Sequence, residues 1–159
     1  MGWGIVYFET TAGKVPAVEF LGACPVKVAA RFHAVLEAVR DAPPPRFSGG
    51  GYWEAMHGAM GGYYEIRLTG PGRRQYRLFC LLDNGDASEL TRRGFDRPQI
   101  AALTGMVKRS GTTFSDRDYA KVRRYGDEYI TEFLAVSLSN KPGALTLLGR
   151  DVRQGEDLG

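Results

Sequence analysis

A hairpin with an apolar second strand is the feature that most constrains the fold of this chain. In the stretch YYEIRLTGPGRRQYRLFCLLD, residues 63–83, apolar and polar side chains first alternate, as they do in a strand with one buried face. The sequence Gly-Pro-Gly then marks a turn. Residues 76–82 are apolar apart from Arg77, which is typical of a central strand covered on both faces. The chain must therefore build a sheet around this hairpin.

The segments on either side of the hairpin predict an α+β fold. A capping box formed by Ser115 and Asp118 is expected to begin the last helix. We expect a helical hairpin packed on a small, antiparallel-rich sheet, and we expect residues 84–98 to form a long loop. The elements predicted from periodicity and turn signals are a strand over 3–10, helices over 16–24 and from 25 to the prolines at 43–45, a strand within 46–62, a strand over 99–105 and a C-terminal helix over 116–135.

Length and composition favour one domain. With 159 residues, the chain is long enough to bury a core without disulfides or metals. We expect the domain to span residues 1–136 and residues 137–159 to form a flexible tail, since they lack sustained periodicity. No apolar run approaches the ~20 residues of a membrane span, and the N-terminus lacks the pattern of a secretory signal. These features predict a cytoplasmic protein without a membrane partner.

The charge is concentrated in the part of the chain that contains the hairpin. The net charge is only +3, but residues 63–136 hold thirteen basic and ten acidic side chains, whereas residues 1–62 hold five of each. Such a local excess suits a phosphate-binding site better than a uniformly basic surface. The two cysteines lack a CxxC spacing and the chain has only two histidines, so we expect no metal site and no cofactor.

Arg77 is the most informative single residue because a charge inside a central strand needs a partner. Either a protein carboxylate or an anionic ligand can fill this role. If the turn centres near Pro71, Arg67 lies opposite Arg77 on the neighbouring strand, and two such guanidinium groups are easier to place together when something negative binds between them. Arg73 and Arg74, beside the turn, are more simply explained as a solvated hairpin tip.

Further basic and titratable residues follow the hairpin or precede it. Lys108 and Arg109 come directly after the predicted fourth strand. Tyr119 belongs to an apolar helical stripe, although its hydroxyl can still reach a cleft. His57, in a glycine-rich stretch, is a candidate proton shuttle. Three more basic residues are spaced like a charged outer helix face, which can also contact a ligand: Arg117, Lys121 and Arg124.

The chain resembles the RelE/ParE toxin superfamily, and more closely its phage-derived Gp49-like branch, which includes the HigB-type toxins. The resemblance is carried by the segments GGGYWEAMHG at 49–58, YYEIRLTGPGRRQYRLFCLLD at 63–83 and KRSGTTFSDRDYAKVRRYGDEY at 108–129. It implies a RelE-like fold, a cytoplasmic toxin of a type II toxin-antitoxin system, and a cognate antitoxin with a helix-turn-helix domain as partner. It also implies an mRNA endonuclease that acts on or near the ribosome.

The resemblance assigns roles to residues of this chain. It implies that Arg77 contacts the scissile phosphate, with Arg67, Lys108 or Arg109, and Tyr119 completing a catalytic group. The implied reaction needs no metal, because the RNA 2'-hydroxyl attacks the adjacent phosphate and cationic side chains offset the developing charge. Lys108, Tyr119 and His57 remain alternative general bases. Residues that would contact RNA outside the reacting phosphate are Arg73, Arg74, Arg117, Lys121 and Arg124.

A second reading of the same sequence is a binding protein without enzymatic activity. The superfamily also contains ParE-like inhibitors of DNA gyrase, and a phage-derived module that binds a host protein is a related alternative. The absence of an obvious general base favours this reading, and fold resemblance alone does not decide between the two.

Overall fold

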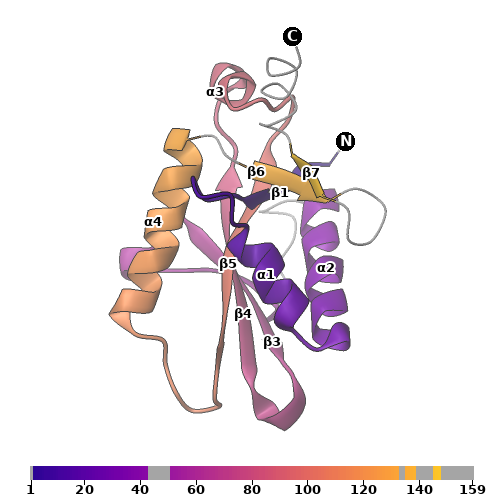
Figure 1. Ribbon diagram of the computed structural model, residues 1–159, viewed down its shortest axis with the longest axis vertical. Helices are drawn as coiled ribbons and strands as arrows, with labels where there is room; N and C mark the ends of the chain where they lie inside the picture. Colours follow the sequence, from indigo (N-terminus) through magenta and orange to yellow (C-terminus); the bar gives the residue numbers. More distant parts are fainter. Residues whose placement is uncertain (1, 43–50, 133–134, 139–144, 148–159) are drawn as a thin grey trace.

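A computed structural model describes residues 2–42, 51–132, 135–138 and 145–147, and it has a mixed α/β fold built on a mostly antiparallel sheet (Figure 1). Short 3₁₀ turns lie at Gly58–Met60 and Pro71–Arg73. The helices and strands are, in chain order, β1 (Gly4–Phe8), α1 (Pro16–Ala23), α2 (Val26–Asp41), β2 (Trp53–Ala55), β3 (Tyr63–Thr69), β4 (Gln75–Asp83), α3 (Ala87–Arg92), β5 (Gln99–Lys108), α4 (Asp116–Glu132), β6 (Ala135–Leu138) and β7 (Leu145–Leu147).

The described strands form a single sheet in the order β2-β3-β4-β5-β1-β6-β7. β1 pairs with β5 in parallel, and the other described pairings are antiparallel. Parallel strands need a long crossover, and here the segment between β1 and β5 contains the two N-terminal helices and the hairpin. The apolar strand β4 therefore lies inside the sheet, between β3 and β5, as its sequence predicts.

The register of the β3–β4 hairpin agrees with the prediction from the sequence. Arg67 lies directly opposite Arg77, and Ile66 lies opposite Leu78. Because side chains alternate along a strand, Ile66 and Leu78 face one side of the sheet and the two arginines face the other. This register brings the paired arginines together.

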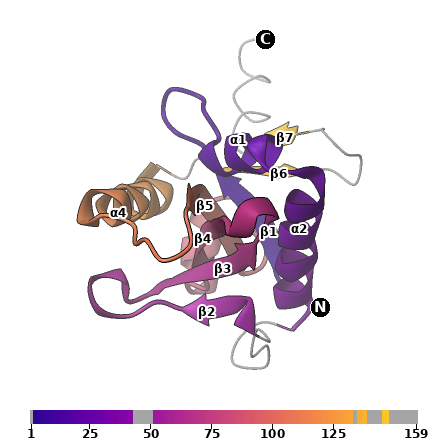
Figure 2. The ribbon, with the colours of Figure 1, turned by 90° about the horizontal axis from the view of Figure 1, so that it is seen from below.

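Helices cover the two faces of the sheet unequally. α1 and α2 pack on the face that includes Ile66 and Leu78, whereas α4 packs on the opposite face against Phe79; Figure 2 shows α4 and α2 on opposite sides of the sheet. Toward the hairpin turn, α4 no longer covers its face, and Arg67 and Thr69 are exposed there. The polar part of the hairpin thus lies near the N-terminal end of α4.

Two predicted elements differ from those observed. Residues 84–98 were expected to form a long loop, but they contain α3, whose first turn is held by a capping box between Asp86 and Glu89. The helix is too short for apolar periodicity to reveal it. The strand predicted over 99–105 is present and continues to Lys108. The capping box of α4 is confirmed, since Ser115 and Asp118 exchange hydrogen bonds of 2.9 and 3.1 Å.

The end of the chain adds strands to the sheet. β6 crosses the expected boundary at residue 136, and β7 lies within the segment expected to be a tail. β6 pairs with β1, and β7 pairs with β6. Of the helices that the structure describes, none combines the length and apolar character needed to cross a membrane.

Candidate functional site

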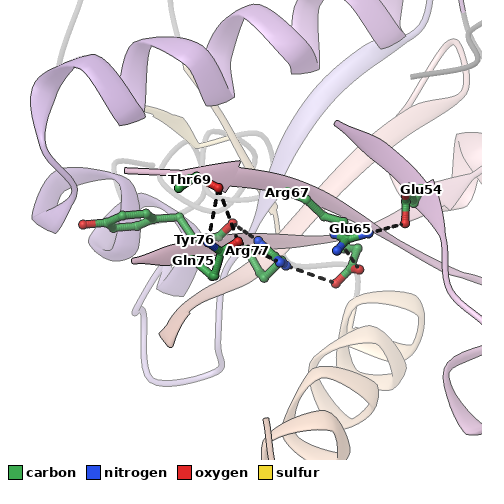
Figure 3. Close-up of polar contacts among 7 residues, drawn as sticks. All are labelled: Glu54, Glu65, Arg67, Thr69, Gln75, Tyr76 and Arg77. Atoms are coloured by element: carbon green, nitrogen blue, oxygen red, sulfur yellow. Dashed lines mark hydrogen bonds and ion pairs between the residues drawn. The ribbon is translucent and has the colours of Figure 1, made fainter. Parts of the chain in front are cut away.

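Arg77 is buried, and its guanidinium group is held by the hairpin itself. The residue is 5% exposed. Its Nη1 donates to the carbonyl of Tyr76 at 3.1 Å, and its Nη2 donates to Oε1 of Gln75 at 3.3 Å. A carboxylate oxygen of Glu65 lies 4.0 Å from Nε, at the outer limit of an ion pair (Figure 3). The sequence left two partners open for Arg77, a protein carboxylate or an anionic ligand. Glu65 is such a carboxylate, but at 4.0 Å it leaves room for an anionic ligand to bind the guanidinium group as well.

Arg67 and Arg77 belong to a group of four alternating charges on one face of the sheet. Glu54 on β2 lies opposite Glu65 on β3, just as Arg67 lies opposite Arg77. Nη1 of Arg67 is 2.8 Å from Oε2 of Glu54, and its Nε is 3.8 Å from Glu65 (Figure 3). Like charges placed opposite each other destabilise a sheet, and the ion pair between neighbouring strands and the one within β3 offset that repulsion.

Burial shifts the pKa values of Glu65 and Arg77 in the directions that favour the neutral forms of both side chains. Desolvation raises the pKa of Glu65, against the opposing effects of Arg77 and Arg67. Desolvation lowers the pKa of Arg77, while Glu65 raises it. Arginine nonetheless keeps its charge in proteins. Glu65 is therefore a carboxylate whose basicity is increased beside a fixed cation, which suits it to accept a proton.

A surface hollow of about 510 Å³ lies beside these charges. We call it the arginine hollow. Among the described residues, three guanidinium groups line it and no carboxylate does. Glu54 and Glu65 contact the arginines from outside this lining, so the hollow itself is cationic and suits an anion. Its lining consists of Arg31, Gly51, Tyr52, Arg67, Thr69, Gln75 and Arg77.

Lys108 and Tyr119 approach the same charges from β5 and α4. Lys108 lies opposite Gln75 in the register, and its Nζ is 5.2 Å from the ring centre of Phe114. Desolvation raises the pKa of Tyr119, which the charge of Glu65 raises further and Arg77 lowers. Tyr119 is therefore a neutral hydroxyl within the electrostatic field of the Glu65–Arg77 pair.

His57 and Tyr119 line a second hollow of about 600 Å³ between the β2–β3 connection and α4. Nη1 of Arg123 lies 3.3 Å from the sulfur of Met60 within this lining. α4 approaches β3 closely here because Gly126 has no side chain, and an added methyl group would overlap Tyr63. The exposed His57 thus shares a hollow with Tyr119 but is not shown in contact with Arg77.

Among the interactions that the structure describes, Arg77 makes no direct contact with the remaining basic residues predicted for the site. Among the described interactions, no side-chain hydrogen bond, ion pair or ring contact joins them to Glu65, Arg67 or Arg77. Lys121 and Arg124 lie over the ring of Tyr125, at 5.8 and 5.5 Å from its centre. The others are exposed at the hairpin turn, just beyond β5 or in the first turn of α4: Arg73, Arg74, Arg109 and Arg117.

Four residues of the candidate site were not predicted from the sequence: two carboxylates that pair with the arginines and two residues that line the arginine hollow. Glu65 was recoverable, because it lies two residues before Arg67 and therefore shares its face. Glu54 depends on where the short strand β2 pairs, and Arg31 reaches the hollow from α2 around the sheet edge. Tyr52 precedes β2 directly. No local pattern in the sequence specifies these last three placements.

Within the part of the chain that the structure describes, no group of three or more His, Cys, Asp or Glu side chains is placed to hold a metal ion. Comparison with known proteins gives no match, whether with family models, curated proteins or solved structures. The resemblance to the RelE/ParE superfamily consequently rests on the sequence segments quoted above.

Proposed function

We propose that this protein cleaves RNA at the arginine hollow by attack of a 2'-hydroxyl on the adjacent phosphate. One observation carries the proposal: Arg67 and Arg77 lie opposite each other on neighbouring strands and, with Arg31, line a hollow to which no carboxylate contributes among the described residues. Guanidinium forks match phosphate oxygens in geometry and charge. A phosphodiester placed there lies beside Glu65, a carboxylate with a raised pKa.

The proposed reaction needs a base, an acid and stabilisation of negative charge. Glu65 accepts the proton of the RNA 2'-hydroxyl, and the 2'-oxygen forms a bond to phosphorus. The bond from phosphorus to the 5'-oxygen breaks, which leaves a cyclic phosphate and a free 5'-hydroxyl. Arg67 and Arg77 stabilise the additional charge on the phosphate oxygens.

Tyr119 is the proposed proton donor to the departing 5'-oxygen. Its phenol is neutral, and it responds to the charges of both Glu65 and Arg77. The phenolate regains a proton from water, with His57 in the neighbouring hollow as a route. Lys108 adds positive charge at the β5 side, where it also acts on Glu65.

The cellular role that we propose is the toxin of a type II toxin-antitoxin pair with a RelE-like fold. The sequence segments that resemble this superfamily contain the hairpin and the start of α4, and these elements carry Arg67, Arg77 and Tyr119. In this proposal the protein acts in the cytoplasm on mRNA at the ribosome. A cognate helix-turn-helix antitoxin keeps it inactive.

Cleavage mapping in a translation extract tests the proposal. Wild-type protein should cut mRNA and leave 5'-hydroxyl ends, and Arg77→Ala should lower the rate by about 10²- to 10³-fold, as for other single donors to a transition-state charge. Lys27→Ala, which removes an equal charge from the exposed start of α2 and lines none of the described hollows, is the matched control and should cleave normally. Arg77→Lys keeps the positive charge but lacks the paired donors of the guanidinium group, so it tests whether those donors are needed. Circular dichroism of each variant shows whether it is folded.

A second candidate function is a binding module without enzymatic activity. It is favoured by the ion pairs of Arg67 with Glu54 and Glu65, which partly neutralise the charges without any ligand. Growth arrest with intact mRNA and co-purification of gyrase or another host protein would support this second candidate. Cleavage that is equally fast in wild type and Arg77→Ala would refute the proposed site.

A further inference from the structure

Arg31 and Tyr52 form a stacked pair at the edge of the sheet, outside the group that would perform the reaction. The guanidinium carbon of Arg31 lies 5.5 Å from the ring centre of Tyr52. Nη1 of Arg31 also donates to the carbonyl of Thr69 at 3.4 Å. Tyr52 is 46% exposed, which is unusual among the aromatic residues that the structure describes. This pair joins α2 to the edge of β3 and remains open to solvent.

The pair separates two hollows of different character. On one side is the arginine hollow, which Arg67 and Arg77 also line. On the other side is a smaller hollow of about 210 Å³, lined by Ala34, Val35 and Leu68 together with the pair itself. Its other lining side chains are apolar. A cationic hollow and an apolar hollow thus share one wall, made of a guanidinium group and an aromatic ring.

We infer that Arg31 and Tyr52 form a subsite for a nucleotide that flanks the reacting phosphate of single-stranded RNA. This inference rests on the proposed RNA substrate of the arginine hollow. Arg31 contacts the flanking phosphate, and the unpaired base stacks on Tyr52 over the apolar hollow. A nucleotide consists of an anion joined to a flat apolar ring, and the two hollows provide for these parts side by side.

The subsite selects single strands over duplexes. Stacking on an aromatic side chain requires a base that has left the helical stack, and such stacking is a common way to bind single strands without sequence preference. Arg31 and Tyr52 contact the RNA strand at the edge of β3, where Arg31 bonds Thr69, while Tyr119 of α4 packs against Phe79 of β4. The bound strand therefore crosses the hairpin from α4 toward α2.

Binding of non-cleavable RNA tests the subsite. Fluorescence anisotropy is measured with fully 2'-O-methylated, fluorescein-labelled tri- and hexanucleotides, which lack the attacking hydroxyl. Arg31→Ala and Tyr52→Ala should each weaken hexanucleotide binding by about five- to tenfold, the lower part of the range for a lost base stack. The trinucleotide has two phosphates, one for the arginine hollow and one for Arg31, so both variants should weaken its binding as well. When the hexanucleotide is annealed to its complement, wild type and both variants should bind it with the same affinity.

The salt dependence separates the two roles. Arg31→Ala should reduce the slope of log K against log salt by about 0.7, the value for one phosphate contact on a single strand. Tyr52→Ala should leave this slope unchanged, and Tyr52→Trp should restore the affinity. Lys27→Ala is the matched control, since Lys27 is an exposed cation on α2 that lines neither hollow. A purely structural role for Arg31 would not change the slope.

The outcomes for the subsite and for RNA cleavage are distinguishable. If wild type cleaves RNA and Arg31→Ala and Tyr52→Ala bind the hexanucleotide as tightly as wild type, the subsite is refuted and the proposed function stands. If no cleavage occurs but both variants lose hexanucleotide affinity, the subsite stands and the enzymatic proposal fails. Wild type that binds neither probe refutes the subsite.

Discussion

Glu65 connects the chemistry of the candidate site with the stability of the protein. It lies between two arginines, yet desolvation outweighs their attraction, so that its pKa in the folded protein is raised. The folded state therefore favours the protonated carboxyl more than the unfolded chain does. The ionised form that would act as a base is thus the form that stabilises the fold less.

The first prediction follows from this shift. The contribution of Glu65 to stability is fully present below its unfolded pKa, about 4.3, and is lost as the pH rises through its higher folded pKa. Glu65→Gln lacks this loss, so its stability relative to wild type should increase over that pH range and then level off. Urea unfolding of both proteins at a series of pH values measures the difference. A constant difference would contradict the prediction.

The same ionisation should appear in the cleavage rate. If Glu65 is the general base, the rate should rise with pH through the midpoint at which stability falls. That midpoint lies above the usual range of a glutamate because of the raised pKa. Glu65→Gln should be slow at every pH and lack this rise. Two different midpoints for rate and stability would assign the base to another residue.

At the scale of single residues, the sequence predicts where a side chain lies when that position depends only on the β3–β4 hairpin. The alternation and the Gly-Pro-Gly turn are sufficient to place Arg67 opposite Arg77, and this pairing is confirmed. Glu54 and Arg31 could not be placed in the same way. Their positions depend on how a three-residue strand and a helix meet the hairpin, and such tertiary packing leaves no local periodicity.

At the scale of elements, α3 is attached to the domain by a buried ion pair. Arg93, at the end of α3, bonds Asp83, at the end of β4, through two nitrogens, and Nε lies 2.8 Å from Oδ2. The hydroxyl of Tyr129 on α4 donates to the same oxygen at 2.8 Å. The hydrogen bond to Asp83 raises the pKa of Arg93. Three elements thus meet at one carboxylate.

The third prediction concerns this junction. Arg93→Ala leaves Asp83 buried without its cation and should destabilise the protein by about 3–5 kcal/mol. Adding Asp83→Asn should recover part of the loss, because it removes the unpaired charge. Arg97→Ala, which breaks an exposed pair with Asp96, is the control and should have little effect in urea unfolding. Equal destabilisation by both single variants would show that α3 is not held by this pair.

Helix α3 was not predicted because it is too short to show apolar periodicity. Periodicity needs several turns, and α3 spans Ala87–Arg92 only. Its capping box of Asp86 and Glu89 follows the known pattern of an N-cap acceptor with an acid three residues later, and it was the available signal. α4, with a full apolar stripe and its own capping box, was predicted with its start correct and its end within a few residues.

At the scale of the whole molecule, the sheet separates two cores and exposes one polar corner. β1 lies between β5 and β6, and because side chains alternate along a strand, Tyr7 contributes to one core and Val6 and Phe8 to the other. The candidate site lies at the hairpin, on strands that do not pair with β6. Strand order of this kind could not be obtained from the sequence, because the parallel pairing of β1 with β5 joins segments about 95 residues apart.

The last prediction separates the role of β6 from that of the chain beyond it. Val136 of β6 is fully buried and Ala135 nearly so, opposite Tyr7 and Phe8 of β1. A chain that ends at Glu132 should lose about 2–3 kcal/mol, the burial of one valine with a small contribution from the alanine. It also leaves β1 as an edge strand that is open to pairing with other chains. A chain that ends at Leu138 keeps the β1–β6 pairs and should lose less.

Urea unfolding and light scattering of the two shortened chains measure these effects, with the full chain as reference. Because the arginine hollow lies on strands remote from β6, the folded fraction of both shortened chains should bind the hexanucleotide with the affinity of the full chain. Equal stability of the two shortened chains would mean that β6 contributes nothing to the fold. Loss of binding by a folded chain that ends at Leu138 would instead place part of the RNA contact after residue 138.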